Sequence, residues 1–339
     1  MNYRVVSDLR EIAINDWLSF VDNHCCCNIF QTYYLYDVYR DVANHEPWIF
    51  VVLDKDNNIY GCMTGVIMKN YGGLLGNFTS RSIVLGGPLV LDNDEIIVDL
   101  LLKEYDKFVS KKAIYTQFRN IFDLRWAETI FYKNGYKYEP HLDIKIDLTL
   151  SKEDIRKNIS KNKRGNVSKT TNRGTIFSEI KNLTDYEKCI DLVFKTYKRV
   201  GLPCPSKQFF VSFFSKLVCD GYLRVFAAIF DGKIIGTRME LCYKNLIYDW
   251  FAGSDDEYKN YYPNDFLPYN ILMWGVDNGF EIFDFGGAGK PNVPYSVREH
   301  KIKFGGDLVE FGRYEKVHKP VKMCLGRLAF GLYKKIKGR

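Results

Sequence analysis

The sequence lacks the features that mark membrane-spanning and secreted proteins. It has no uninterrupted run of the roughly 20 apolar residues that a membrane-spanning helix needs. Residues 1–20 carry acidic and polar side chains where a signal peptide needs an apolar run. We therefore expect a cytoplasmic protein. With 339 residues, 46% of them hydrophobic and 16% aromatic, the chain is long enough for two domains with sizeable cores.

Motifs of several common enzyme classes are also absent. The nine cysteines form no CxxC pair, so we expect reduced thiols and no metal site, and the run at 25–27 is more typical of a loop or a helix start. There is no GxSxG motif, and none of the five histidines lies in a motif with a nucleophile, which disfavours a hydrolase. The glycines at 86–87 and 286–289 follow neither a GxGxxG nor a P-loop pattern, so they predict tight turns.

Positive charge is concentrated in two segments. The formal net charge is +7, yet residues 316–339 hold eight Lys or Arg and no acid, which leaves about −1 for the rest of the chain. Residues 156–173 hold seven further cations and again no acid. This distribution favours two local contact regions for anions over general binding of a polyanion.

A repeated pattern predicts two copies of one domain. Residues 47–68 and 222–243 each consist of an apolar run, an Asp-containing turn and a second run, which is typical of an antiparallel hairpin. A helix-like stretch precedes each hairpin, and a helix and a strand follow it. Chance recurrence in an α+β protein is the alternative. We expect α/β (α+β) domains at 1–150 and 151–315.

The two basic segments are both expected to be helical. Ser151 followed by Asp154 has the spacing of a helix cap, so a helix should begin there. Residues 316–339 have apolar side chains at helical spacing with cations between them, which predicts a basic amphipathic helix. Two interpretations of this helix remain open: it packs on its own domain, or it contacts an anionic membrane surface.

The second half resembles a known family. An Asn-x-x-Leu helix at 264–267 leads to Phe-Asp-Phe-Gly-Gly at 283–287, and His-Lys-x-x-Phe-Gly-Gly follows at 300–306. In this order and spacing the motifs resemble the FemAB family of the GNAT superfamily, whose third motif begins with Phe-Lys. Here His300 replaces the aromatic residue and Lys301 is retained. The resemblance covers residues 150–315, including a basic helix at 159–177.

The resemblance implies a fold and an activity. The fold would be two tandem GNAT-like domains with mixed central sheets flanked by helices. The activity would be transfer of an acyl or aminoacyl group to an amine of a cell-envelope or glycan precursor, as in peptidoglycan synthesis. The donor remains undecided between acyl-coenzyme A and aminoacyl-tRNA, because the chain has no clean Arg/Gln-x-x-Gly-x-Gly/Ala loop. A lipid-linked acceptor would bring the protein to the inner face of the membrane.

Three residues are the candidates for catalysis. Acyl transfer to an amine requires a cation or amide dipoles where negative charge develops on the carbonyl oxygen. The resemblance assigns this role to Lys301, which without the family motif would be interpreted as a solvated lysine. Asp284 fits either a base or a cap of the Gly286–Gly287 turn. Asp249 is a second candidate base or substrate-orienting residue.

Further candidates would bind substrate, and one alternative function remains. Strand alternation places Tyr248 on the opposite face from Asp249. The expected substrate contacts are Lys161, Arg164, Tyr248, His300, Lys303 and Phe304. The replacement at His300 motivates the alternative that the chain is an inactive GNAT-like module that binds an anionic nucleic acid or membrane surface.

Overall fold

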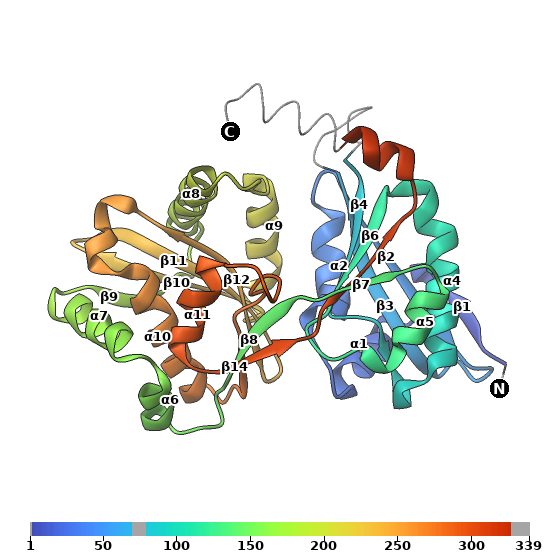
Figure 1. The fold of residues 1–339 in the computed structure, drawn as a ribbon, viewed down its shortest axis with the longest axis horizontal. Coiled ribbons are helices and arrows are strands. Elements are labelled where there is room, and N and C mark those ends of the chain that lie inside the picture. The colour runs from blue at the N-terminus through green and yellow to red at the C-terminus, as the bar shows by residue number, and fades with distance from the viewer. Residues whose placement is uncertain (1, 70–78, 327–339) are drawn as a thin grey trace. The chain divides into compact units, whose positions relative to one another are not determined.

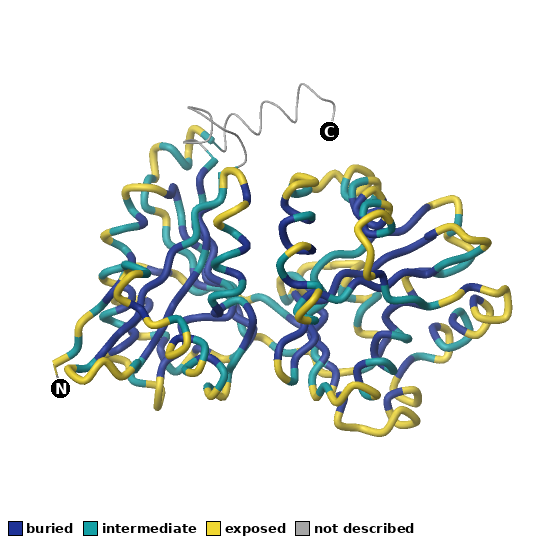
Figure 2. Tube along the Cα trace, turned by 180° about the vertical axis from the view of Figure 1, so that it is seen from behind, coloured by how far each residue is buried: buried dark blue, intermediate teal, exposed yellow. Residues whose placement is uncertain are grey.

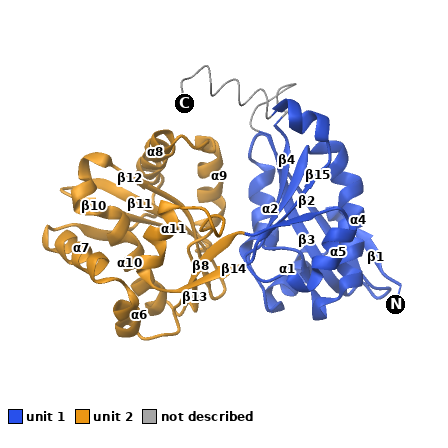
Figure 3. Ribbon diagram, in the orientation of Figure 1, with its two compact units in different colours: residues 1–140, 311–339 blue, residues 141–310 orange. Residues whose placement is uncertain are grey.

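The computed structural model describes residues 2–69 and 79–326, which form two compact units. Unit 1 comprises residues 1–140 and 311–339, and unit 2 comprises residues 141–310 (Figure 3). Each unit is built around one sheet whose strands are mostly buried, while the exposed residues gather on loops and outer helices (Figure 2).

The sheet of unit 1 has eight strands among the described residues. In spatial order these are β1 (Arg4–Val6), β2 (His45–Leu53), β3 (Ile59–Met68), β4 (Arg81–Leu85), β6 (Tyr115–Arg119), β15 (Arg313–Val317) and β7 (Lys137–Glu139), with β5 (Leu89–Val90) paired to β3 (Figure 1). The pair β4 and β6 is parallel and the other pairs are antiparallel, so the sheet is mixed.

Helices cover both faces of this sheet. They are α1 (Ile14–Asn23), α2 (Tyr33–Arg40), α4 (Glu95–Lys112) and α5 (Glu128–Lys133). One face carries the main core, in which α4 contributes Leu101 and Tyr105 against Trp48 and Phe50 of β2. Trp17 of α1 and Leu35 of α2 are buried on the other side.

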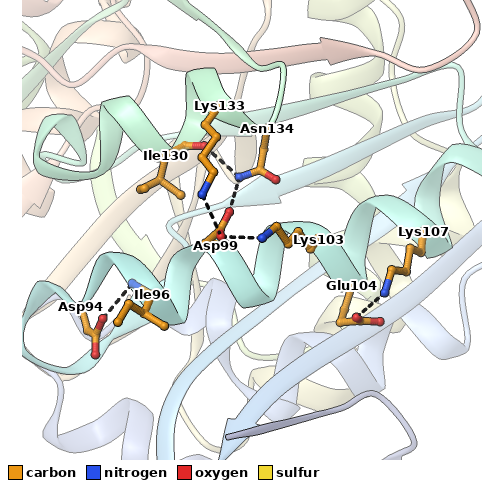
Figure 4. Close-up of polar contacts among 9 residues, drawn as sticks. All are labelled: Asp94, Ile96, Asp99, Lys103, Glu104, Lys107, Ile130, Lys133 and Asn134. Carbon is orange, nitrogen blue, oxygen red and sulfur yellow. Dashed lines mark hydrogen bonds and ion pairs between the residues drawn. The ribbon is translucent and has the colours of Figure 1, made fainter. Parts of the chain in front are cut away.

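Polar contacts along α4 show how local sequence defines this helix (Figure 4). Asp94 caps its start by accepting a hydrogen bond from the backbone N–H of Ile96 at 2.8 Å. Asp99 accepts from Lys103 of the same helix at 2.7 Å and from Asn134, at the end of α5, at 2.8 Å. A single carboxylate therefore joins the two helices on the outer surface of the unit.

The sheet of unit 2 has seven strands among the described residues. In spatial order these are β14 (Asp307–Glu310), β8 (Leu142–Asp147), β13 (Ile282–Asp284), β12 (Leu246–Ser254), β11 (Lys233–Tyr243), β10 (Leu223–Phe230) and β9 (Ile176–Glu179). Only β12 and β13 are parallel in the described sheet. Taken in reverse, from β9 to β14, this order corresponds to the order of unit 1 from β1 to β7, without a counterpart of β5 in the described sheet.

Helices again lie on both faces. They are α6 (Lys152–Asn158), α7 (Lys161–Asn172), α8 (Leu183–Val200), α9 (Lys207–Leu217), α10 (Pro263–Asp277) and the short α11 (Ser296–Lys301). The core on one face combines residues of α6, α7 and α10 with the sheet. On the other face, α8 contacts β11 and β12, and the Tyr186 hydroxyl of α8 donates to the carbonyl of Phe210 in α9.

Local sequence signals are confirmed in several places. Both predicted hairpins are present, as β2–β3 and β10–β11. The second turns through Asp231 and Gly232, both with positive φ, as a tight two-residue hairpin turn requires. Ser151 accepts a hydrogen bond from the backbone N–H of Asp154 and caps α6, as its spacing predicted.

The unit boundaries differ from the expected 150/151 division because the units exchange strands. β8, expected to end the first domain, pairs with β13 and β14 in the second sheet. β15, expected mainly in the second domain, pairs with β6 and β7 in the first. The strand that follows β7 in sequence, β8, therefore belongs to the sheet of unit 2, and the strand that follows β14, β15, belongs to the sheet of unit 1. The sequence could not predict this, because the periodicity of a strand carries no information about the strands with which it pairs.

The C-terminal segment differs in part from the expected helix. Residues 316 and 317 belong to β15, and residues 320–326 are helical, with Val321 and Leu325 exposed. The remainder of the predicted helix, 327–339, lies outside the described residues. No helix in the described part of the chain is long and apolar enough to cross a bilayer.

Candidate functional site

The candidate site lies in unit 2, where the parallel strands β12 and β13 stop pairing. Their last paired residues are Tyr248 and Asp284, yet β12 continues to Ser254. The pairing of β11 with β12 shifts register here, so that Trp250 is an extra residue opposite Met239 and Glu240. Such a bulge re-aims the side chains beside it. Backbone groups of β12 therefore extend past the end of its neighbour.

Lys301 of α11 reaches the turn that follows β13. Its Nζ donates to the carbonyl oxygens of Phe285 at 2.6 Å, Gly287 at 3.2 Å and Gly286 at 3.3 Å. Burial lowers the pKa of Lys301, while the charges of Asp249 and Asp143 oppose that shift. The predicted catalytic lysine is thus half-buried and held by three backbone carbonyls, and it is not a freely solvated side chain.

A buried ion pair and an unpartnered acid lie beside Lys301. Arg238 of β11 forms an ion pair with Asp249 of β12, and their side chains are 7% and 8% exposed. Glu240, opposite Asp249 in the strand register, is fully buried, and neither of its carboxyl oxygens has a hydrogen-bond partner among the described residues. Burial, and then the charge of Asp249, raise the pKa of Glu240 well above its ordinary value.

A second pair of carboxyl groups lies below the turn. Asp284 accepts a hydrogen bond from the backbone N–H of Gly286 at 2.7 Å, so its side chain does cap the turn. Its other oxygen lies 3.7 Å from Nζ of Lys145. Burial, and then the neighbouring Asp284, raise the pKa of Asp143 well above its ordinary value. Each of these two buried carboxyl groups accepts a hydrogen bond from a backbone N–H, Asp143 from Ile144 and Asp284 from Gly286.

His300 belongs to a buried polar cluster that joins α7, α10 and α11. Its Nδ1 lies 2.9 Å from Nζ of Lys163, which also forms an ion pair with Asp265. Asn166 donates to the other Asp265 oxygen at 2.7 Å. Burial, and then the charge of Lys163, lower the pKa of His300 to about 4. The neutral ring therefore accepts a hydrogen bond from Lys163, and the Phe304 ring packs 5.5 Å away, centroid to centroid.

The structure separates the predicted site residues into two groups. Lys301, Asp249, Asp284 and His300 lie within one electrostatic cluster. Lys161 and Lys303 are exposed and Arg164 is half-buried. Within the described residues, the side chains of Lys161 and Arg164 form no ion pair. Tyr248 lies close to the turn, because a Cβ placed on Gly286 would be 3.2 Å from its hydroxyl.

The sequence interpretation missed five members of the cluster: Asp143, Lys163, Arg238, Glu240 and Asp265. Arg238 and Glu240 alternate with Met239 and Leu241, which resembles an ordinary strand with one polar face. Helices cover both faces of the sheet, so the polar face of this strand is buried as well. The signal that could have identified Arg238 and Glu240 is their charge, because they lie within the second strand of a hairpin whose first strand is mainly apolar.

The corresponding place in unit 1 is filled by side-chain amides. Gln31, at the end of the 3-10 helix η2 (Ile29–Gln31), donates from Nε2 to the carbonyl oxygens of Leu85 at 2.8 Å and Thr64 at 3.1 Å. Its Oε1 accepts from the backbone N–H of Thr64 at 2.9 Å. Asn28 donates to the carbonyl of Gly86 at 2.8 Å. Neutral groups therefore close the end of the β4–β6 pair.

Two thiols and a histidine lie close together near η2. Ligand atoms of His24, Cys25 and Cys26 lie within 4.8 Å of one another, which resembles a metal-ligand group, although the sequence predicted no metal site. Nδ1 of His24 accepts from the backbone N–H of Cys26 at 3.0 Å, and Nε2 lies 3.0 Å from the carbonyl of Val90. Both ring nitrogens already have protein partners in this arrangement.

Comparisons with known proteins agree with this architecture. Residues 154–295 match the family described as "Acetyltransferase (GNAT) domain". The UDP-N-acetylmuramoylpentapeptide-lysine N(6)-alanyltransferase of Weissella viridescens is 24% identical over 228 residues, which are 64% of this chain and 63% of that protein. The match thus spans less than two thirds of the relative's length.

Two solved structures share the fold. The crystal structure of FemX has a TM-score of 0.75 at 12% identity and covers 96% of this chain and 100% of its own. A tandem GNAT protein from the clavulanic acid biosynthesis pathway has a TM-score of 0.60 at 9% identity and covers 94% and 99%. The expected fold class, tandem GNAT-like domains with mixed sheets flanked by helices, is confirmed.

Proposed function

We propose that this chain, whose residues 154–295 match a GNAT acetyltransferase domain and whose fold is similar to that of FemX, is a FemAB-like enzyme that transfers an aminoacyl group to an amine of a cell-envelope precursor. The Weissella viridescens relative supports the choice of acceptor, since its name describes alanyl transfer to the lysine of a UDP-linked muramoyl pentapeptide. The acceptor proposed here is an amine of the same class, on a soluble or lipid-linked glycan precursor.

The half-buried Lys301 side chain, which donates to three backbone carbonyls, is the observation that carries the proposal. In the reaction, the acceptor ammonium first loses a proton to solvent, and the neutral amine attacks the donor carbonyl. A C–N bond forms, the C–O bond of the donor ester breaks, and the proton lost by the nitrogen balances the one that the released alkoxide takes up to become a hydroxyl. Negative charge develops on the carbonyl oxygen meanwhile. The three ammonium hydrogens of Lys301 now face three backbone carbonyls, two of them at 3.2 and 3.3 Å. In the transition state, one of these two longer hydrogen bonds would be replaced by a hydrogen bond from Lys301 to the developing oxyanion.

Asp249 and Asp284 then have different roles in the proposed site. Asp249 is held by Arg238 next to Lys301, where it attracts the acceptor ammonium and orients it. Asp284 holds the turn whose carbonyls bind Lys301. Tyr248 lies beside Gly286, whereas Phe304 is fully buried and supports the His300 ring that packs on it.

For the donor we propose aminoacyl-tRNA over acyl-coenzyme A. Lys161 and Arg164 project from a helix that has no acid in its sequence, and Lys303 follows on the adjacent segment. Exposed cations of this kind contact phosphates without reading sequence. Because the helix also carries Lys169, an extended polyanion fits the charge distribution better than one pyrophosphate.

The test is a transfer assay with the purified protein. Donors are a charged tRNA mixture or acetyl-coenzyme A, and acceptors are UDP-linked and lipid-linked muramoyl pentapeptides. We expect product from charged tRNA, and a loss of about 10²–10³-fold in kcat for Lys301→Met, the magnitude typical for removing one oxyanion contact. Lys188→Met, in which the lysine removed is 61% exposed on α8, is the matched control and should retain activity.

Two results would contradict the proposal. Product from acetyl-coenzyme A alone would make the protein an ordinary N-acetyltransferase. Salt-dependent binding of tRNA or anionic vesicles without transfer from any donor would favour the inactive binding module. Full activity of Lys301→Met would show that the site has been placed wrongly.

A further inference from the structure

We propose that Lys163 and Asp265 are positioning residues that act on Lys301 through His300. Their ion pair, hydrogen-bonded to the His300 ring, would fix the short helix α11 so that the next residue, Lys301, reaches the Phe285–Gly287 carbonyls. The consequence for catalysis rests on the proposed function, but the geometric claim does not.

The first argument is that the ion pair is built into the interior. Lys163 is 7% exposed and Asp265 is 6% exposed. Asp265 uses both oxygens, one for Lys163 and one for Asn166, and it lies in the first turn of α10, where a negative charge is favourable. Buried charges are costly unless they are paired, so these side chains have one permitted arrangement.

The second argument is that α11 needs an external anchor. It has only six residues, no side-chain cap at its start and no buried residue, and helices of this length are not stable by themselves. The loop before it, 285–295, contains three glycines and two prolines. His300 supplies a directional contact to the rigid elements α7 and α10, which a phenyl ring at this position could not make.

The third argument concerns the protonation state of His300. The ring must be neutral to accept a hydrogen bond from Lys163. The charged groups that influence it are Lys163 on α7, Asp265 on α10 and Arg238 on β11, and burial together with the two cations outweighs Asp265. The pKa of His300 is lowered to about 4, so the acceptor form persists throughout the neutral range.

The fourth argument is that His300 and Lys163 form a matched pair. Lys163 Nζ also lies 5.2 Å from the centroid of the Phe304 ring, and His300 packs on the same ring. Replacing His300 by Phe removes the acceptor and leaves a buried N–H of Lys163 without one. Replacing both, as Lys163→Met with His300→Phe, would substitute apolar contacts for the polar ones.

The experiment measures Lys301 directly in the protein without substrate. Lysines labelled with ¹³C at Cε are observed by NMR, and the Lys301 signal is assigned by its absence in Lys301→Arg. We expect His300→Phe and Lys163→Met to shift this signal and its titration toward those of a solvated lysine. The double variant should recover much of the shift, and Lys188→Met should not change it.

A second readout uses the transfer reaction. Each single variant should lower kcat at least tenfold with little change in the acceptor KM, and the double variant should be less impaired than the sum of the two. Thermal unfolding checks that each variant is folded. If Lys163→Met does not fold, His300→Phe alone carries the test, because it leaves the ion pair intact.

The outcomes separate the two claims. An unchanged Lys301 signal in folded His300→Phe would overturn the positioning role, whatever reaction the protein performs. A shifted signal with strictly additive effects of the two substitutions would overturn it too, because coupling is its central prediction. A shifted, coupled signal without transfer from any donor would support the positioning role and contradict the proposed function.

Discussion

The two units have the same strand order but opposite chemistry at the end of their parallel strand pair. In unit 1 the side-chain amides of Gln31 and Asn28 satisfy the free backbone groups. In unit 2 the same place holds Lys301, the Arg238–Asp249 pair and the unpartnered acid Glu240. A side-chain amide can donate to a backbone carbonyl and accept from a backbone N–H, so it satisfies both kinds of free backbone group. The buried carboxyl group of Glu240 has no hydrogen-bond partner among the described residues, so its burial is unfavourable.

This difference explains how one fold provides both a scaffold and a candidate site. A Cβ on Gly87 would lie 2.5 Å from the Gln31 amide carbon, so backbone and amide are packed without spare space in unit 1. In unit 2 the groups nearest the 285–287 turn are charged: Lys301 donates to the turn carbonyls, and Arg238 and Asp249 form an ion pair beside it. The following predictions test this contrast, beginning with the largest expected effect.

Breaking the ion pair of unit 2 should have the largest effect on stability. Arg238→Met leaves the Asp249 carboxylate buried without its partner, which should cost about 3–5 kcal/mol. Hydrogen exchange of β11 and β12 measures this loss within unit 2. Arg199→Met is the control: it removes an exposed pair with Asp256, so a loss of at most about 1 kcal/mol is expected. Equal losses would contradict the contrast.

Opening the amide closure of unit 1 should have the next largest effect. Gln31→Ala leaves the N–H of Thr64 and the carbonyl of Leu85 unsatisfied and creates a cavity, at a cost of about 2–4 kcal/mol. Hydrogen exchange should increase in β3 and β4 and remain unchanged in β11 and β12. Asn23→Ala, an exposed amide on α1, provides the control. Increased exchange in unit 2 would show that the closure acts beyond unit 1.

Glu240 should give unit 2 a stability that decreases as pH rises. Its pKa is raised in the folded state, so above the unfolded pKa near 4.5 the folded state holds a proton that the unfolded state releases. The stabilisation is complete below that pH and is lost as pH rises toward the folded pKa, at about 1.4 kcal/mol per pH unit for one proton. Glu240→Gln cannot ionise and should reduce the slope between pH 5 and 8. An unchanged slope would mean that Glu240 is ionised.

His318 should give unit 1 the opposite, smaller dependence. Nε2 of His318 lies 2.8 Å from the Thr116 hydroxyl, and burial lowers its pKa to about 4. The unfolded state therefore binds a proton first as pH falls below about 6.5, and stability is lost between that pH and about 4. Exchange of β6 and β15 should increase over this range in the wild type but less in His318→Gln. Equal responses would remove His318 as the cause.

Short-range features could be predicted because local chemistry decides them. The hairpins follow from apolar runs separated by turn residues, and the cap at Ser151 follows from a hydroxyl three residues before the N–H that it accepts. The motif around Lys301 also indicated the part of unit 2 in which Lys301, Asp249 and Asp284 lie close together. The partners of that lysine could not be predicted, since Arg238 and Asp143 come from strands about 60 and 160 residues earlier.

By itself the sequence determined the repeated strand and helix pattern, the turns, and the candidate lysine within its motif, because each depends on residues close together in the chain. The exchange of β8 and β15 between the sheets was decided only by tertiary structure, since strand pairing depends on partners far away in sequence. Tertiary structure also decided which charges are buried. Burial raised the pKa of Glu240, which looks like an ordinary strand residue in the sequence, because removing water disfavours the charged form.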